Sequence, residues 1–288
     1  MNIEKMGYWH VCADRLIGSL LFRDEEDYRM GMNVIPICLY SLDLIEYCHA
    51  LMSDHFHLLG AGTYSQMMNL FRAIKCRLGR YTAWKYHEKQ PLRDWDCEIF
   101  PLPDATAFRN EVGYILRNEY AAGVNAPLNS RWNTGHLYFN PWLDAIKGTK
   151  VGDMSIREVR TILKTKTPVP DGYEFHNGII LPKCYVSYRK VEELFGTSID
   201  FFQSLKDWNQ ERNVEGAHDG SSYSAYSDLQ LGKMLKAELS GLGAASARDL
   251  SPTGLRQMIR LLHRKYGAGV NQIQHFTGAD PETILRFK

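Results

Sequence analysis

The stretch LMSDHFHLLGAG, residues 51–62, places two histidines in a run that is otherwise mostly apolar. With the preceding LIEYCHA it predicts a hairpin of two strands, bent at the Ser-Asp pair and closed by glycines. Side chains alternate along a strand, so His55 and His57 share one face of the sheet and Phe56 points to the other. The two imidazoles therefore lie within reach of one cation. Two hydrogen-bonded surface histidines would satisfy the same spacing.

The composition is that of a globular protein without a strong charge signature. The chain has 288 residues, of which 44% are hydrophobic, so it can bury a substantial core. Its 34 basic and 33 acidic residues nearly cancel, so contacts with nucleic acid must come from local patches. The six cysteines form no CxxC pair and are expected to be reduced, buried thiols. With no signal-peptide pattern and no long apolar run, we expect a soluble cytoplasmic protein without a membrane partner.

The first half of the chain alternates between strand and helix patterns. A β-like run at Tyr8–Cys12 precedes an acidic helix start, and the hairpin and a helix over residues 65–87 follow. After the Pro-containing stretch 91–103, a further helix is expected to begin at its cap Asp104 and to stop at Gly123. This order predicts an α+β sandwich. The apolar side chains of the helix over 65–87 recur every three or four residues: Met67, Phe71, Ile74, Leu78 and Tyr81.

The remaining sequence divides by composition. Residues 1–140 carry the sandwich, and residues 141–212 are a mixed region. The stretch 213–228 is rich in Gly and Ser and is the predicted linker. Residues 229–288 are expected to be all-helical and to resemble a helix-turn-helix, and a cap followed by Pro marks two helix starts, at Ser251-Pro252 and Asp280-Pro281.

The helix that follows Asp104 presents a second polar group of interest. Its apolar stripe leaves Glu111, Tyr114 and Asn118 together on another face. A phenol is a useful nucleophile when a metal ion polarises a phosphate placed against it, and an amide oxygen one turn away can serve as a third metal ligand. A tyrosine on the surface of an amphipathic helix is the alternative interpretation. The apolar stripe consists of Phe108, Val112, Ile115 and Leu116.

Four segments of the chain, and their order along it, resemble the single-tyrosine HUH transposases, in particular the REP-associated tyrosine transposases. LMSDHFHLL is similar to the family's LMPNHVHLL, with Ser53 and Asp54 in place of Pro-Asn. GYILRNEYAAGV is similar to the segment YIxxNPxRAGL that carries the nucleophilic tyrosine, with Glu119 in place of Pro. FRDEEDYRMGMNVI resembles the family's segment between the first strand and the first helix, and MMNLFRAIKCRLGRYTAWKY resembles its basic helix. The resemblance covers residues 7–140.

This resemblance implies a ferredoxin-like HUH domain with a central antiparallel sheet. It implies that Tyr114 attacks a phosphodiester of single-stranded or hairpin DNA, leaving a 5′-phosphotyrosine and a free 3′-hydroxyl. His55 and His57 would hold Mg²⁺ or Mn²⁺ with Asn118 as a helper. Glu111 is either an outer contact of this site or a solvated charge. Members of the family act as monomers or as dimers with shared sites, so a homodimer is possible within it.

Two basic surfaces are candidate DNA contacts. The helix over residues 65–89 has six basic residues against one acid, with Trp84 and Tyr86 near its end. Cations attract phosphates and aromatic faces stack on bases, a combination suited to single strands. A solvated helix, and for the C-terminal helices a protein-interaction module, are the alternatives. The DNA-binding candidates are Arg72, Lys75, Arg77, Arg80, Lys85, Arg260, Arg264 and Arg286.

Three functions follow from these patterns. The first is metal-dependent DNA cleavage and strand transfer of the transposase type. The second is a catalytically retired DNA-binding protein derived from such an enzyme, which the changes at Ser53, Asp54 and Glu119 keep open. The third is a metal-dependent hydrolase with a water nucleophile, in which Tyr114→Phe would leave activity intact.

Overall fold

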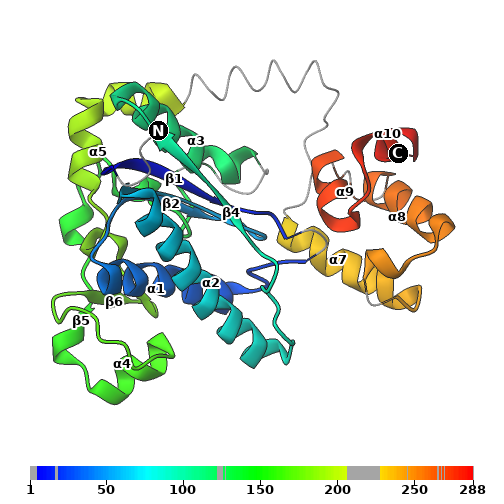
Figure 1. The fold of residues 1–288 in the computed structure, drawn as a ribbon, viewed down its shortest axis with the longest axis horizontal. Helices are drawn as coiled ribbons and strands as arrows, with labels where there is room; N and C mark the ends of the chain where they lie inside the picture. The colour runs from blue at the N-terminus through cyan, green and yellow to red at the C-terminus, as the bar shows by residue number, and fades with distance from the viewer. Residues whose placement is uncertain are drawn as a thin grey trace.

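A four-stranded antiparallel sheet forms the centre of the protein (Figure 1). The computed structural model describes residues 5–16, 19–121, 126, 128–205, 228–244, 246–264, 266, 268 and 270–287. The sheet runs in the order β2-β3-β1-β4, and its elements follow the succession β1, α1, β2, β3, α2, β4 along the chain. The predicted α+β class and central antiparallel sheet are confirmed. The bounds are β1 (Gly7–Ala13), α1 (Glu25–Leu42), β2 (Ile45–Leu51), β3 (Phe56–Gly62), α2 (Tyr64–Tyr86), β4 (Cys97–Leu102) and α3 (Ala105–Ala121).

Helix starts are fixed by caps that the local sequence supplies. Asp24 accepts the main-chain N–H of Asp27 at the start of α1. Thr63 and Gln66 bond each other's main-chain N–H groups at the start of α2, forming a capping box. Asp104 accepts the main-chain N–H of Ala107 before α3, as its predicted role as a cap requires. The predicted stop at Gly123 lies outside the described residues.

The sheet separates two layers of helices, with α1 and α2 on one side and α3 on the other (Figure 1). Because side chains alternate along a strand, Trp9 and Val11 of β1 pack with α1 and α2. The same alternation in β3 directs Leu58 to that side, whereas Leu59 packs against α3. His57 has the parity of Leu59, so it faces the layer that contains α3.

The strand β4 lies within the stretch 91–103, from which the sequence predicts no strand. Pro101 interrupts its pattern, because proline has no main-chain N–H to donate. The structure accommodates Pro101 since β4 is an edge strand that pairs only with β1, where Pro101 lies opposite Trp9. The proline thus marks the edge of the sheet.

The mixed region forms a small second sheet that packs on α1. Its strands run in the order β5-β6-β7. Asn33 of α1 joins the helix to this sheet by two hydrogen bonds. Its side chain donates to the carbonyl of Gly178 and accepts a bond from the N–H of Ile180, both at 2.8 Å. The elements are β5 (Thr149–Lys150), α4 (Ile156–Leu163), β6 (Glu174–His176), β7 (Ile179–Ile180) and α5 (Tyr188–Phe195), with short 3-10 helices η1 (Gly135–Leu137), η2 (Leu143–Ala145), η3 (Val151–Asp153) and η4 (Pro182–Cys184).

The C-terminal segment is helical, as predicted, and forms a group of its own beside the sheet (Figure 1). Its helices enclose a separate apolar core. Ser251 accepts the N–H of Gly254, and Asp280 accepts the N–H of Thr283, so both predicted caps are present. Residues 213–227 of the predicted linker lie outside the described residues. The elements are α7 (Asp228–Gly241), η5 (Ala247–Asp249), α8 (Pro252–Arg264), α9 (Val270–Thr277) and α10 (Pro281–Phe287).

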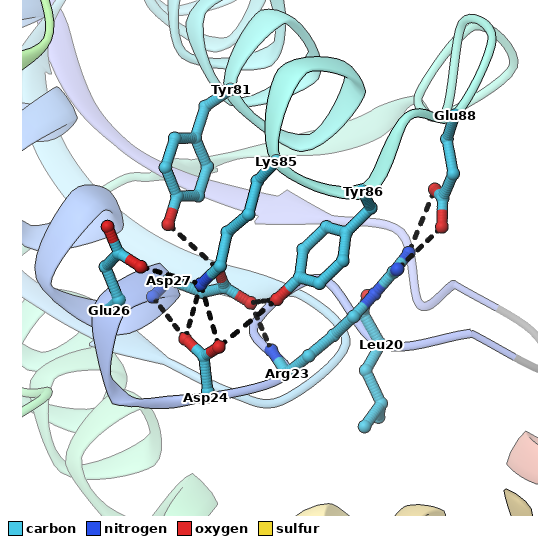
Figure 2. A network of polar contacts seen from close by, with 9 residues as sticks. All are labelled: Leu20, Arg23, Asp24, Glu26, Asp27, Tyr81, Lys85, Tyr86 and Glu88. Atoms are coloured by element: carbon cyan, nitrogen blue, oxygen red, sulfur yellow. Dashed lines mark hydrogen bonds and ion pairs between the residues drawn. The ribbon is translucent and has the colours of Figure 1, made fainter.

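A polar network joins the start of α1 to the end of α2, as Figure 2 shows. We call Asp24, Asp27, Tyr81, Lys85 and Tyr86 the α1–α2 clamp. The Lys85 ammonium lies 2.7 Å from a carboxylate oxygen of Asp24 and 2.7 Å from one of Asp27. Both tyrosine hydroxyls donate to Asp27, at 3.0 Å from Tyr81 and 2.6 Å from Tyr86. Every carboxylate of the clamp therefore has a donor within the protein.

Among the described residues, no helix combines the length and the apolar character needed to cross a membrane.

Candidate active site and metal centre

The two histidines of the hairpin meet on the α3 side of the sheet. His55 lies immediately before β3 and His57 is its second residue. Both are almost fully buried, and their Nε2 atoms are 3.0 Å apart. The structure therefore directs the two imidazoles at one point, with the same nitrogen of each ring facing the other.

Each of these two imidazoles has a hydrogen-bond partner at its Nδ1 atom. The Nδ1 of His55 lies 2.6 Å from a carboxylate oxygen of Asp54. The Nδ1 of His57 lies 3.0 Å from the Nε2 of His10, whose own Nδ1 lies 2.9 Å from Glu111. We call these five residues the histidine row. A carboxylate stands at each end of the row, the arrangement that orients metal-binding histidines in proteins.

The two carboxylates fix where the protons lie when all three rings are neutral. Asp54 accepts a hydrogen bond from the Nδ1–H of His55, which leaves a lone pair on the Nε2 of His55. Glu111 accepts from His10, so the His10 Nε2 must accept from His57, and the Nε2 of His57 then also carries a lone pair. Two lone pairs facing each other at 3.0 Å repel each other and can both bind one cation placed between them. The donor chemistry of the row thus fits a divalent cation.

Electrostatics favours a neutral His57. Burial lowers the pKa of His57 well below its ordinary value of 6.5, and the neighbouring His55, His10 and Arg15 lower it further. A neutral imidazole is the form that binds a metal ion. The ring is therefore in its ligating state at neutral pH.

The ring of Tyr114 in α3 lies edge-on beside His57 and His10. Its ring centroid is 5.5 Å from that of His57 and 6.0 Å from that of His10. The side chain is 44% exposed, while the apolar stripe of α3 packs against the sheet. Burial raises the pKa of the Tyr114 phenol, and Cys12 and Glu111 add to this effect. Arg15 and Asn118 partly oppose it, so the phenol keeps its proton at neutral pH.

Asn118 lies one turn after Tyr114 on the same helix. Its amide nitrogen donates to the main-chain carbonyl of Tyr114 at 3.0 Å. The structure therefore joins Asn118 to the tyrosine, whereas a ligand role would use its amide oxygen. The predicted metal ligation by Asn118 stays a prediction.

Sequence reasoning missed His10 and Cys12, which lie on β1 across from β3. Ligand atoms of His10, Cys12 and His57 all lie within 4.8 Å of one another, so these three residues form an alternative donor set for a metal ion. Burial, with a smaller contribution from Glu98, raises the pKa of the Cys12 thiol to about 11. Tyr8, His10 and Cys12 alternate along the strand, so the sequence could have predicted that they share a face. Their approach to His57 depends on the register of β1 against β3.

Arg15 is a further cation beside the site that the sequence reasoning did not single out. It is exposed just beyond β1. Its charge lowers the pKa of both His57 and Tyr114, so it acts electrostatically on both groups. An arginine in this position is suited to bind a phosphate.

The predicted DNA contacts on α2 lie on the opposite side of the sheet from the histidine row, and three of the five are engaged within the protein. Lys75 donates to main-chain carbonyls of the segment before β4. Arg77 donates to Thr165 and Thr167 at 3.2 and 2.9 Å. Lys85 belongs to the α1–α2 clamp, and these contacts favour a structural role for it. The exposed candidates on α2 are Arg72 and Arg80.

On the C-terminal helices, Arg260 and Arg286 are exposed. The side chain of Arg264 lies outside the described residues. Arg256 stacks on the ring of Phe287, with its guanidinium carbon 4.7 Å from the ring centroid. Of the predicted DNA contacts on these helices, Arg260 and Arg286 are therefore accessible to a partner.

No family model and no curated protein matches the chain. One solved structure that is similar carries the description "Structure of the REP associates tyrosine transposase bound to a REP hairpin". The match has 15% sequence identity and a TM-score of 0.37, and it covers 60% of this chain and 89% of that one. The chain is similar to a REP-associated tyrosine transposase. At this TM-score the likeness is distant, and it carries no weight in assigning roles to individual residues.

Proposed function

We propose that the protein is a metal-dependent transesterase of the HUH type that cleaves and joins single-stranded or hairpin DNA. The observation that carries the proposal is the facing pair of Nε2 atoms of His55 and His57 with the Tyr114 ring beside them. The proposed nucleophile and the proposed ligands of a cation thus lie close together, on a helix and at a buried strand. A protein that only binds DNA has no physical need for this set.

His55 and His57 would hold Mg²⁺ or Mn²⁺, with Asn118 as the proposed third ligand. A bound metal ion would neutralise charge on the scissile phosphate. Tyr114 forms the new bond from its phenol oxygen to phosphorus, and the bond from phosphorus to the 3′-oxygen breaks. The DNA is left as a 5′-phosphotyrosine and a free 3′-hydroxyl. Because the pKa of Tyr114 is raised, its proton must leave as the bond forms.

The architecture agrees with this proposal. The strand order β2-β3-β1-β4 and the succession of strands and helices along the chain support our proposal of a ferredoxin-like domain. We propose that residues 1–140 form the HUH domain and that residues 229–288 are a helix-turn-helix-like module. In the DNA contact, Arg15 would bind phosphate near the site. Exposed cations elsewhere would contribute more distant contacts: Arg72, Arg80, Arg260 and Arg286.

The test is a covalent adduct on a denaturing gel. The protein is incubated with labelled single-stranded hairpin oligonucleotides from the flanks of its own gene, with and without Mn²⁺. We expect a metal-dependent adduct that is lost in Tyr114→Phe. The matched control is Tyr40→Phe, a half-exposed tyrosine at the far end of α1, which should retain the adduct.

Two alternative functions predict other outcomes of the same assay. Cleavage without an adduct that survives in Tyr114→Phe would indicate a hydrolase, for which the donor set of His10, Cys12 and His57 offers a metal site. Tight binding of these hairpins with neither adduct nor cleavage would indicate the retired DNA-binding protein.

A further inference from the structure

The C-terminal helices reach the histidine row through the side chain of His275. His275 of α9 is buried, and its Nδ1 lies 3.1 Å from the Oδ2 atom of Asp54. The other oxygen of the same carboxylate, Oδ1, lies 2.6 Å from the Nδ1 of His55. Asp54 therefore stands between an imidazole of the metal site and an imidazole of a different domain.

Apolar packing beside this contact holds the two parts together. Leu20, in the loop between β1 and α1, packs against the core of the C-terminal helices. A Cβ atom placed on Gly232 of α7 would lie 3.0 Å from Leu20 and 3.4 Å from Phe276, so α7, α9 and this loop approach closely. The loop is also joined to the hairpin bend, since the N–H of Leu21 donates to the carbonyl of Ser53 at 2.8 Å.

We propose that His275 is a positioning residue of the metal site, through which the C-terminal domain holds Asp54 and thereby orients His55. This inference rests on the proposed function, because it assumes that His55 and His57 bind the metal ion. Its physical basis is the geometry of the bridge. A carboxylate fixed by a contact at each oxygen can hold the His55 ring in one orientation, whereas a carboxylate fixed at one oxygen can rotate. Losing such an outer contact costs about 10- to 100-fold in metal affinity in other proteins.

The experiment measures Mn²⁺ affinity of the full chain by calorimetry. His275→Phe keeps the packing but removes the polar atom, and we expect it to weaken Mn²⁺ binding about tenfold. His275→Gln keeps a donor that can reach Asp54 and should restore most of the affinity. The matched control is His263→Phe on α8, in the same domain, which should bind Mn²⁺ as the wild type does. Thermal melting of each variant shows whether it is folded.

A second measurement needs no metal. The nitrogen-bound proton of His55 gives an NMR signal that reports its bond to Asp54, and we expect this signal to shift in His275→Phe and to return in His275→Gln. If the folded His275→Phe variant binds Mn²⁺ like the wild type and leaves this signal unchanged, the inference is wrong. If the wild type itself binds no Mn²⁺ while the signal shifts as expected, the proposed metal site fails and the contact between the domains stands.

Discussion

The histidine row is a largely buried polar network and the α1–α2 clamp a partly exposed one, and they differ in the balance of hydrogen-bond donors and acceptors. In the clamp, the carboxylates of Asp24 and Asp27 meet the ammonium of Lys85 and two phenol hydroxyls, so donors and acceptors balance within the protein. In the row, carboxylates at both ends leave two acceptor nitrogens facing each other. A balanced network stabilises a fold, whereas one with two acceptors facing each other is suited to bind a cation.

The largest expected effect comes from removing a central ligand of the row. His57→Ala should reduce Mn²⁺ affinity at least about 100-fold, because one of two facing imidazoles is lost. Lys85→Met should leave Mn²⁺ affinity unchanged at a temperature where it is folded. Calorimetric titration of both variants measures this contrast, and equal losses in the two would remove the distinction between the networks.

For stability, we expect the large effect in the clamp. Lys85→Met leaves the carboxylate of Asp27 buried without its cation, so the free energy of unfolding should fall by about 3 kcal/mol. Arg80→Met, on the exposed face of the same helix, should change it by less than about 0.5 kcal/mol. Urea unfolding followed by circular dichroism gives both values. A loss for Lys85→Met as small as that for Arg80→Met would show that the clamp is not a structural element.

The two networks should also lose stability in different pH ranges. The pKa of His57 is lowered well below 6.5 by burial, so below pH 6.5 the unfolded chain takes up a proton that the folded chain does not. Metal-free protein should therefore lose up to about 1.4 kcal/mol per pH unit from this group as the pH falls. His57→Gln should flatten that slope in urea titrations.

The clamp responds at lower pH. The pKa of Asp24 is lowered from 3.8 because its bonds to Lys85 and to main-chain N–H groups outweigh the effect of burial. Its contribution is present above that pH and is lost as the pH falls through the lowered pKa. Lys85→Met should reduce but not abolish this acid-side loss, because the main-chain N–H bonds to Asp24 remain, and it should leave the slope due to His57 in place. An unchanged acid-side loss in Lys85→Met would contradict the assignment.

The smallest effect concerns Arg15, which lies beside the row. Arg15→Ala should weaken binding of hairpin DNA and reduce the slope of log affinity against log salt by about 1, as expected for one phosphate contact. Arg93→Ala is the control, since that exposed arginine is paired with Asp94 at 3.1 Å. Fluorescence anisotropy at several salt concentrations measures both. Identical slopes for wild type and Arg15→Ala would exclude the contact.

Sequence could predict what local periodicity and short motifs encode. The hairpin, the helix of Tyr114 and the helix caps at Ser251 and Asp280 follow from alternation, three- and four-residue spacing and cap chemistry. The convergence of His55 and His57 follows from the two-residue period of a strand. These features depend on residues that are neighbours along the chain.

The rest depends on contacts between distant segments. The strand β4 was hidden by Pro101, because only its place at the edge of the sheet makes a proline tolerable there. His10 reaches His57 through the register of β1 against β3, and His275 reaches Asp54 from another domain. The ion pairs of Lys85 with two aspartates could not be predicted either. A basic helix face has the same sequence pattern whether it binds DNA or carboxylates of the same protein.

The most direct measurement of the central claim is the anomalous diffraction of a crystal of the full chain soaked with Mn²⁺. We expect one peak between the Nε2 atoms of His55 and His57, on the side of the sheet that carries Tyr114. A peak among His10, Cys12 and the Nδ1 of His57, or no peak at the row at a concentration that saturates binding in solution, would contradict it.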